Sequence, residues 1–226
     1  MTSDSEQKRT CGCERVPEQT VSRLPVYRRC LMQASAIGVQ VINSLQLAQM
    51  AGTNAAQVRK DLSYLGELGT RGIGYDVAAL RGHLSEVLGV GERRRVALIG
   101  FGRLGGSLLG YRGFFERGFD IVAVFDVDPV RVGTLVDWHG AVPKGLTVRS
   151  IEHIERDLLD LDVEIVMLAV PMEVAQVMAE RVVRGGVSAI LNFAPVALEL
   201  PEHVLVRSVD MSTDLQVLSY HLSRQG

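Results

Sequence analysis

The sequence predicts an α/β protein in which a doubly wound parallel sheet follows a smaller helical domain. Three observations support this fold class. Short apolar runs alternate with helical stretches from residue 93 onward, which is typical of a parallel sheet covered on both faces. A glycine-rich turn, residues 100–105, follows the first of those runs. The preceding ninety residues have instead the apolar spacing of helices.

Composition narrows the class of protein. The chain has 226 residues, of which 47% are hydrophobic, and a net charge of −2. This length suffices for two modest domains, and no apolar stretch approaches the ~20 residues of a membrane span. The N-terminus is charged and has no apolar signal segment, so we expect a soluble, cytoplasmic protein. Residues 1–90 hold ten Lys and Arg against eight Asp and Glu, a balance that permits nucleic-acid binding without proving it.

The three cysteines predict no metal site. Cys11 and Cys13 stand in a polar tail without a second pair of ligands, so the spacing of a zinc site is not met. Either they are incidental thiols or they form a functional pair. Cys30 is expected to be buried on a helix.

Residues 1–21 are polar and without period, and we expect a disordered tail. A domain spanning 22–91 follows. Leu24, Tyr27 and Leu31 mark the apolar face of a first helix that ends at Gly38. A short helix from Ser44 to Met50, capped by Ser44, comes next.

A third helix is capped by Thr53 or Asn54, and Asn54-x-x-Gln57 approximates a capping box. Ala48 and Gly52 are small residues four apart, which lets two helices cross closely as in a helix-turn-helix. Residues 66–75 contain four glycines and suit a β-hairpin wing.

The outer face of the third helix and the wing are candidates for DNA contact. Arg59, Lys60, Ser63 and Tyr64 fall mostly outside, and Arg71 at the hairpin tip is placed to enter a minor groove. A solvated charged face is the competing interpretation. The neighbouring helix-turn-helix pattern favours DNA.

Residues 92–211 predict a Rossmann domain. The expected strands are 95–99, 121–125, 163–170, 187–193 and 204–210, and the expected helices are 104–116, 151–159 and 172–185. The last segment, 212–226, carries a helix over 212–224 with Leu215, Val217, Leu218 and Leu222. This apolar stripe must be buried on its own domain or on another chain.

The glycine turn predicts a dinucleotide site. Gly100 allows the tight turn, Gly102 lets the backbone approach a pyrophosphate, and Gly105 lets the helix pack close to its strand. Asp126 ends the second strand 21 residues after Gly105, close to the spacing of the carboxylate that binds the adenosine ribose. It favours NAD(H) over NADP(H), although Arg131 lies nearby. Alternatively, Asp126 only terminates its strand.

A dinucleotide site behind a DNA-binding domain suggests a sensor, and two other functions remain as alternatives to it. An NAD-dependent oxidoreductase needs a proton donor beside the nicotinamide, and none of the five histidines ends a strand beside a partner. Too few residues follow the sheet for a substrate domain. A CoA- or nucleotide-binding regulatory protein has the same sheet and turn, but Asp126 disfavours the 3′-phosphate of CoA.

Several strings together resemble the Rex family of redox-sensing repressors. They are VRKDLSY (58–64), GTRGIGY (69–75), FDVDP (125–129), LAVP (168–171) and ILNFAP (190–195). The resemblance covers about residues 22–224. It implies a non-enzymatic homodimer that binds a palindromic double-stranded operator and is released when NADH, rather than NAD⁺, binds the Rossmann domain. It also implies that the C-terminal helix is domain-swapped and dimerises the protein.

The resemblance also assigns residues. DNA would contact Gln57, Arg59, Lys60, Ser63, Tyr64, Arg71, Gly72 and Tyr75. NAD(H) would contact Gly100, Phe101, Gly102, Arg103, Leu104, Gly105, Tyr111, Asp126, Val127, Ala169, Val170, Pro171, Asn192 and Asp210. Arg29 and Asp210 would form an ion pair that changes with cofactor state. Met211 replaces the aromatic residue that the family often has there, which leaves the packing at the nicotinamide open. No catalytic residue and no metal are implied.

Overall fold

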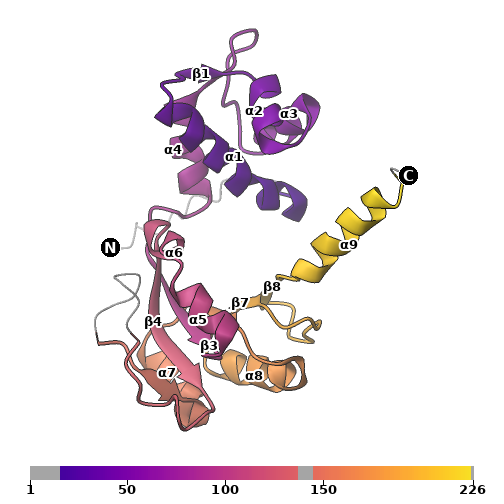
Figure 1. The fold of residues 1–226 in the computed structure, drawn as a ribbon. Coiled ribbons are helices and arrows are strands. Elements are labelled where there is room, and N and C mark those ends of the chain that lie inside the picture. Colours follow the sequence, from indigo (N-terminus) through magenta and orange to yellow (C-terminus); the bar gives the residue numbers. More distant parts are fainter. Residues whose placement is uncertain (1–15, 137–144, 225–226) are drawn as a thin grey trace, which may run out of the picture. The chain divides into compact units, whose positions relative to one another are not determined.

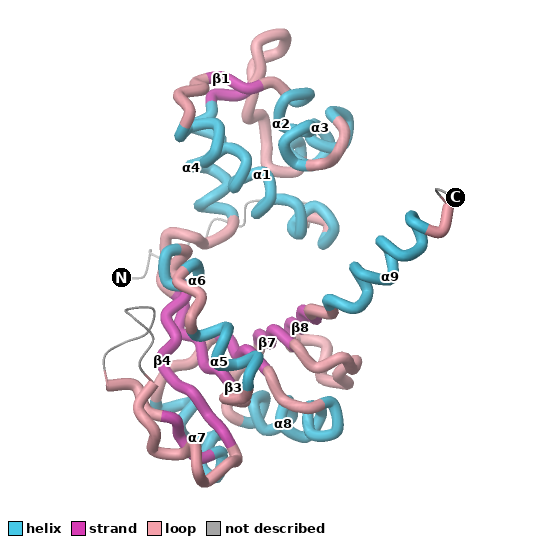
Figure 2. Tube along the Cα trace, in the orientation of Figure 1, coloured by secondary structure: helices cyan, strands magenta, loops and turns pink. Residues whose placement is uncertain are grey.

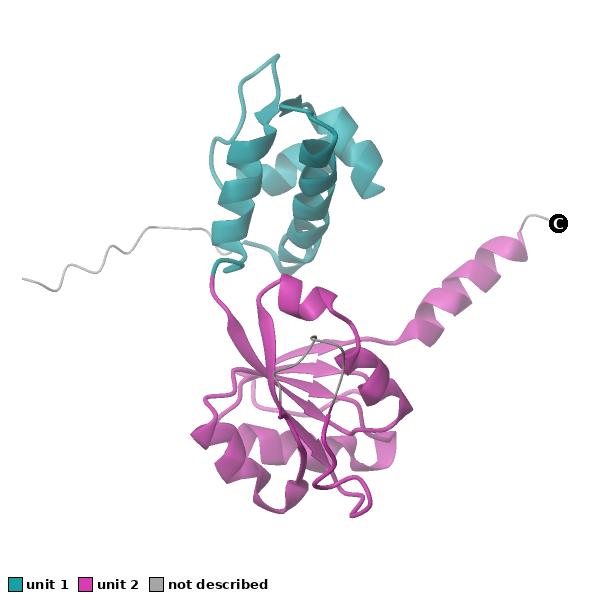
Figure 3. Ribbon diagram, turned by 60° about the vertical axis from the view of Figure 1, so that its left-hand side comes forward, with its two compact units in different colours: residues 1–91 teal, residues 92–226 magenta. Residues whose placement is uncertain are grey.

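A computed structural model describes residues 16–136 and 145–224 of the chain. The chain forms two compact units, residues 1–91 and 92–226 (Figure 3). Each unit has its own hydrophobic core. Cys11 and Cys13 lie outside the described residues, and Cys30 is a buried free thiol.

The first unit is helical, with one short strand pair (Figure 1). Its elements are α1 (Glu18–Ala36), β1 (Val41–Ile42), α2 (Ser44–Ala51), α3 (Ala55–Ser63), β2 (Tyr75–Asp76) and α4 (Val77–Val87). The core is built from Leu24 and Tyr27 of α1, Leu47 of α2, Val58 of α3 and Leu80 of α4, all almost fully buried. Within α1, α3 and α4 the buried residues follow the spacing of three or four that the sequence displays.

The first helix begins earlier than predicted. α1 starts at Glu18, directly after Pro17, within the stretch expected to be a disordered tail up to residue 21. The apolar pattern could not reveal this turn, because its buried residue is polar. Thr20 is 2% exposed and donates a hydrogen bond to Asp61.

The cap of α2 also differs from the prediction. The Asn43 side chain accepts from the N–H groups of Leu45 and Gln46, and the Gln46 side chain accepts from the Asn43 N–H. The predicted Ser44 cap is therefore wrong by one residue. The capping box lies at Asn43, and Asn54 caps α3 through the N–H of Gln57.

The predicted hairpin at residues 66–75 is a loop closed by one bridge between Thr70 and Gly74. The regular ladder lies instead between β2 and β1, where Tyr75 pairs antiparallel with Ile42. Gly74 has a φ of +119°, and a Cβ there would lie 2.6 Å from the Ile42 carbonyl oxygen. Glycine is needed where these two backbones meet. We call residues 66–75 the wing.

The second unit contains a six-stranded parallel sheet (Figure 2). Its strands are β3 (Arg94–Ile99), β4 (Phe119–Asp126), β5 (Val148–Ser150), β6 (Ile165–Leu168), β7 (Ala189–Asn192) and β8 (Leu205–Ser208), in the order β5-β4-β3-β6-β7-β8. The chain reverses its direction of travel across the sheet between β3 and β6. Ligands of such sheets bind outside the carboxyl ends of the strands at this point. The short edge strand β5 was not predicted.

Both faces of the central strands are buried. Along β3, Ala97 and Ile99 face the cluster covered by α7 (Ile154–Asp160) and α8 (Met172–Arg184), whereas Val96 and Leu98 face the opposite cluster. The opposite face packs on α5 (Arg103–Leu109) and α6 (Gly113–Glu116). The sequence predicted one helix over 104–116, but residues 110–112 interrupt it. A 3₁₀ turn, η1 (Ile151–His153), precedes α7.

The C-terminal helix α9 (Met211–Leu222) buries none of its residues. Leu215, Val217, Leu218 and Leu222 are between 51% and 70% exposed. The predicted apolar stripe is therefore present, and within the described chain nothing covers it. The sheet has an apolar groove of its own, lined by Val96, Phe114, Phe119, Ile121, Ile165, Met167, Ala189, Ile190, Leu191, Leu205 and Arg207.

Candidate functional site

The glycine turn after β3 has three differently constrained glycines. Gly100 has a φ of +96°, and a Cβ there would lie 2.4 Å from the carbonyl oxygen of Ala169. A Cβ on Gly105 would lie 1.9 Å from the Gly100 carbonyl oxygen. Gly102 faces open space, with nothing within 4 Å of its Cβ position. Gly100 and Gly105 thus close the turn, and Gly102 leaves backbone accessible to a ligand.

Gly102 is also the N-cap residue of α5. The first N–H groups of a helix have no partner within it, and they carry a partial positive charge. Phosphate oxygens are well matched to such a position. Arg103, the first residue of α5, is exposed beside it.

Asp126 lies at the end of β4, next to this turn. It is 5% exposed. One carboxylate oxygen accepts from the Phe101 N–H at 2.6 Å and from Arg131 Nη1 at 3.2 Å, and the other accepts from the Asp128 N–H at 2.8 Å. The carboxylate therefore links the end of β4 to the glycine turn that follows β3.

These residues line a cavity of about 760 Å³ at the carboxyl ends of β3, β4 and β6. This volume falls within the range of small-molecule and cofactor sites. The predicted residues that line it are Gly100, Gly102, Arg103, Leu104, Asp126, Val127, Ala169, Val170 and Pro171. The structure thus brings together most of the predicted cofactor residues, and we call this cavity the nucleotide pocket.

Five predicted cofactor residues do not line the nucleotide pocket. Phe101 packs against the core, and Gly105 is buried under the turn. Asn192 is fully buried, and its amide bonds the backbone of Ala194 and Val196, which closes the loop after β7.

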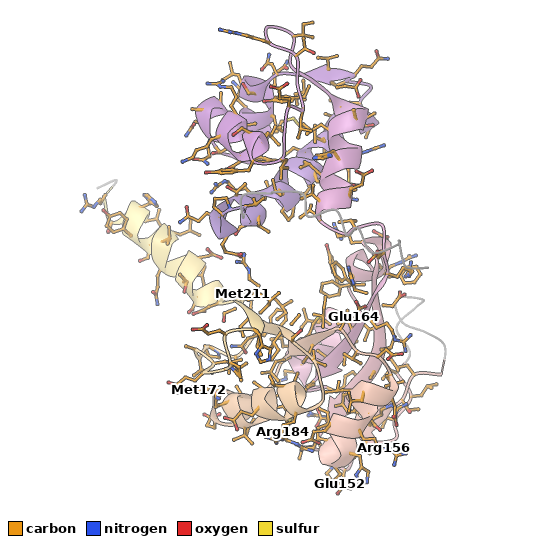
Figure 4. The ribbon with its side chains drawn as sticks, turned by 180° about the vertical axis from the view of Figure 1, so that it is seen from behind. Glu152, Arg156, Glu164, Met172, Arg184 and Met211 are labelled. Atoms are coloured by element: carbon orange, nitrogen blue, oxygen red, sulfur yellow. The ribbon has the colours of Figure 1, made fainter. Side chains whose placement is uncertain are left out.

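Tyr111 and Asp210 are exposed. Tyr111 follows α5, and its hydroxyl accepts from Arg117. Asp210 caps α9 through Ser212 and Thr213; the hydrogen bonds from Ser212 lower its pKa. Met211 is the first residue of α9 (Figure 4). Its side chain is exposed. Arg29 is exposed on α1, in the other unit, so its pairing with Asp210 stays a prediction.

Sequence reasoning missed one wall of the nucleotide pocket. Val174, Val177, Met178 and Arg181 of α8 line it. Arg131, which the sequence placed near Asp126, lines the pocket as well. Val174 and Val177 are 46% and 60% exposed. They extend the apolar spacing of α8, which runs from Met172 to Arg184 (Figure 4). A helix apolar on more than its core face was the available signal.

The first unit has a second hollow surface, between α3 and the wing. Ser44, Arg59, Ser63, Arg71, Gly72 and Tyr75 are among its lining residues. Arg59 Nη1 donates to the Ser44 hydroxyl at 2.9 Å. Arg71 and Gly72 are exposed at the tip of the wing, where Gly72 has a φ of +84°. Five of the eight predicted DNA-contact residues therefore share one concave surface, which we call the α3–wing surface.

The other three predicted DNA-contact residues lie outside this lining. Lys60 is exposed on α3, and Tyr64 is half-buried. Gln57 points inward, since its Nε2 donates to Asp61 at 2.8 Å. Asp61 itself, fully buried on α3, was not predicted. A charged residue on the inner face of a helix gives no signal in a hydrophobic pattern.

The described residues were searched for metal-ligand clusters and for membrane-spanning helices. No group of three or more His, Cys, Asp and Glu in residues 16–136 and 145–224 is arranged to hold a metal ion. Over the same residues, we find no helix whose length and apolar content would let it span a membrane.

Two family models match the chain, one for each unit. A family model described as "Putative DNA-binding protein N-terminus" matches residues 15–63, and one described as "CoA binding domain" matches residues 91–196. The redox-sensing transcriptional repressor Rex of Carboxydothermus hydrogenoformans is 43% identical over 210 residues, covering 93% of this chain and 98% of that protein. The Rex of Pelotomaculum thermopropionicum is 44% identical, covering 92% and 94%. The chain belongs to the Rex family.

Solved structures agree with this membership. The chain matches RSP, a Rex-family repressor, in its complex with β-NAD⁺ and operator DNA, with a TM-score of 0.84, 32% identity and 94% of each chain covered. It matches RSP in complex with β-NADH with a TM-score of 0.83 and 31% identity, covering 94% of this chain and 96% of that one. Rex proteins are transcriptional repressors, so the chain is a regulator and not a dehydrogenase.

Proposed function

We propose that this chain represses transcription by binding double-stranded operator DNA through the α3–wing surface, and that NADH in the nucleotide pocket releases it. The observation that carries the proposal is the presence, in one chain, of an accessible helix-turn-helix surface and a glycine turn bordered by Asp126. The two lie in separate compact units. A ligand site and a DNA surface in separate units suit a switch, because the two sites share no residue.

The nucleotide pocket supports NAD(H) as the ligand. Asp126 places an acceptor where the adenosine ribose is expected, and a 2′- or 3′-phosphate there would meet its negative charge. Ala169, Val170, Pro171 and Phe193 supply apolar surface on the β6 side. Burying the charged ring of NAD⁺ against apolar groups costs more than burying the neutral ring of NADH. We therefore expect NADH to bind more tightly.

The related RSP structures support the direction of the switch. RSP has been seen with β-NAD⁺ together with operator DNA, and with β-NADH. A ligand shifts a two-state equilibrium only as far as its affinities for the two states differ. A hundredfold preference of NADH for the form that does not bind DNA corresponds to about 2.7 kcal/mol of coupling.

We further propose that the protein is a homodimer held by α9, and that it binds a palindromic operator. The exposed apolar stripe of α9 is costly in water unless another surface covers it. The apolar groove of the sheet offers a surface of matching chemistry on a second copy. A symmetric dimer reads two half-sites at a fixed spacing. Such a protein acts on DNA in the cytoplasm.

A DNA-binding titration tests the proposal. The duplex is the sequence that the protein selects from a random library, and its release is followed by fluorescence anisotropy with NADH, NAD⁺ and NADPH in parallel. We expect NADH to release DNA at the lowest concentration. Equal potency of NADH and NAD⁺ would refute redox sensing, and failure to select any sequence would refute repression through operator DNA.

A further inference from the structure

Helix α3, which holds half of the predicted DNA-contact residues, carries a fully buried carboxylate. Asp61 is 0% exposed, although its neighbour Lys60 is exposed. A buried carboxylate is strongly unfavourable unless its oxygens are hydrogen-bonded and its charge is paired. The partners of Asp61 therefore decide whether this helix packs at low cost.

Those partners come mainly from one helix, α1. Arg23 donates from Nε at 2.6 Å and from Nη2 at 2.8 Å, one bond to each carboxylate oxygen. The Tyr27 hydroxyl donates at 2.7 Å and the Thr20 hydroxyl at 3.0 Å. Gln57, one turn earlier on α3, supplies a fifth bond at 2.8 Å. A planar guanidinium bound through two bonds fixes direction as well as distance.

The charge is held firmly. Burial by itself raises the pKa of Asp61, but the hydrogen bonds from Arg23, Tyr27, Gln57 and Thr20 outweigh it and lower the pKa to about 2. The pKa of Arg23 is raised, first by its hydrogen bond to Asp61. Both groups therefore remain ionised throughout the physiological range.

An ion pair of this kind does what apolar packing cannot. Apolar contact is non-directional, so Val58 and Leu62 hold α3 in the core while tolerating small rotations. Side chains project from a helix in fixed directions about 100° apart. A rotation of α3 about its own axis therefore turns its DNA-facing side chains away from base edges. The bonds from Arg23, Tyr27 and Thr20 resist that rotation.

We propose that Asp61 is a positioning residue for DNA reading, which with Arg23 and Tyr27 sets the rotation of α3 against α1. Arg59, Lys60 and Ser63 then face outward in one fixed orientation. The proposal rests on the proposed function, since it concerns the quality of DNA recognition. It predicts that loss of Asp61 affects sequence discrimination more than general affinity for DNA. Phosphate contacts tolerate small rotations, whereas base contacts do not.

The experiment compares wild type with Asp61→Asn, which keeps the shape and removes the charge. Affinities are measured for the duplex selected by the wild-type protein and for a mixed-sequence duplex of equal length. We expect the ratio of the two affinities to fall at least about tenfold, a loss within the range of specificity ratios. Affinity for the mixed duplex should change less than about twofold, as expected of phosphate-dominated binding.

Glu86→Gln is the matched control, because it removes one negative charge from an exposed position on α4 of the same unit. It should leave the ratio unchanged, and NADH affinity should be unchanged in both variants. Thermal unfolding measures the folded fraction of each. If Asp61→Asn does not fold, Arg23→Lys provides the test, because lysine keeps the charge but cannot make the two-bond contact.

The outcomes separate the explanations. A folded variant that keeps the wild-type ratio overturns the positioning role. Equal loss on both duplexes, in proportion to the unfolded fraction, shows that Asp61 only stabilises the unit, and this also overturns it. A wild-type protein that selects no sequence instead refutes the proposed function.

Discussion

The carboxylate of Asp126 accepts a 2.6 Å hydrogen bond from the backbone N–H of Phe101, which joins the end of β4 to the glycine turn after β3. Its other oxygen accepts from the N–H of Asp128 and holds the loop after β4. One side chain thus shapes two borders of the nucleotide pocket. The carboxylate expected to bind the ribose also orders the turn that would hold the pyrophosphate.

We expect Asp126→Ala to weaken NADH binding at least about tenfold, since one charge-assisted hydrogen bond contributes about 1.5–3 kcal/mol. DNA binding without cofactor should persist, because the first unit has its own core. NADH titration and DNA binding measure the two effects. Asp160→Ala, which removes an exposed carboxylate on α7, serves as the control. Loss of both activities would show that Asp126 is chiefly structural.

Arg131 determines what replaces the lost specificity. Its guanidinium lies 3.2 Å from Asp126 and 3.4 Å from Asp128. Without Asp126, it becomes available to a 2′-phosphate. We expect Asp126→Ala to shift preference toward NADPH relative to NADH by about tenfold, which is 1.4 kcal/mol. Adding Arg131→Ala should abolish the shift, and persistence of the shift in that double variant would exclude Arg131 as its cause.

Two glycines of the turn should respond differently to substitution by alanine. Gly105→Ala places a Cβ against the Gly100 carbonyl and should destabilise the second unit by about 1–3 kcal/mol. Gly102→Ala meets no neighbour and has a φ of −79°, so stability should change by less than about 0.5 kcal/mol. Its NADH affinity should still fall, because the methyl group occupies the approach of the pyrophosphate. Thermal unfolding and NADH titration distinguish the two, and a stable Gly105→Ala variant would contradict this account.

Local pattern was enough to predict the two domains, and within the nucleotide pocket the glycine turn and Asp126. The glycine turn and the Asp126 spacing are short-range signals, whereas Ala169, Val170 and Pro171, which follow β6, were assigned by the resemblance to the Rex family. Parallel strands bring their carboxyl ends to one edge, which places these residues together. The choice between Asn43 and Ser44 as the cap of α2 was not predictable in this way. Both residue types cap well, and the Gln46 side chain decides between them.

Long-range polar contacts account for most of what the sequence concealed. Asp61 is separated from Arg23 by 38 residues and from Thr20 by 41. An acid beside two basic residues on a helix predicts an exposed position. Burial of its carboxylate becomes favourable only when hydrogen-bond donors from distant parts of the chain converge on it. The early start of α1 has the same cause, because Thr20 is buried by its bond to Asp61.

Acid should weaken the second unit through Glu155. Two hydrogen bonds of 2.7 Å from Arg181 lower the pKa of Glu155 from 4.5 to about 2. A carboxyl with a lowered pKa stabilises the fold above its unfolded value, and this contribution is lost as pH falls from about 4.5 to 2. We expect Glu155→Gln to be less stable than wild type at neutral pH and to show a flatter acid dependence. Thermal unfolding between pH 6 and 2 checks this, with the exposed Glu202→Gln as control; parallel wild-type and Glu155→Gln profiles would contradict it.

Lys60 tests whether DNA contact extends along α3 beyond the α3–wing surface, because its exposed side chain has no structural partner to lose among the hydrogen bonds and ion pairs of the described residues. If its ammonium contacts a phosphate, Lys60→Ala weakens binding to all sequences and lowers the slope of log affinity against log salt by about one. NADH affinity should be unchanged. Arg156→Ala, which removes an 82% exposed positive charge from α7 in the second unit, controls for net charge. An unchanged salt slope in Lys60→Ala would mean that the Lys60 ammonium contacts no phosphate and is solvated when DNA is bound.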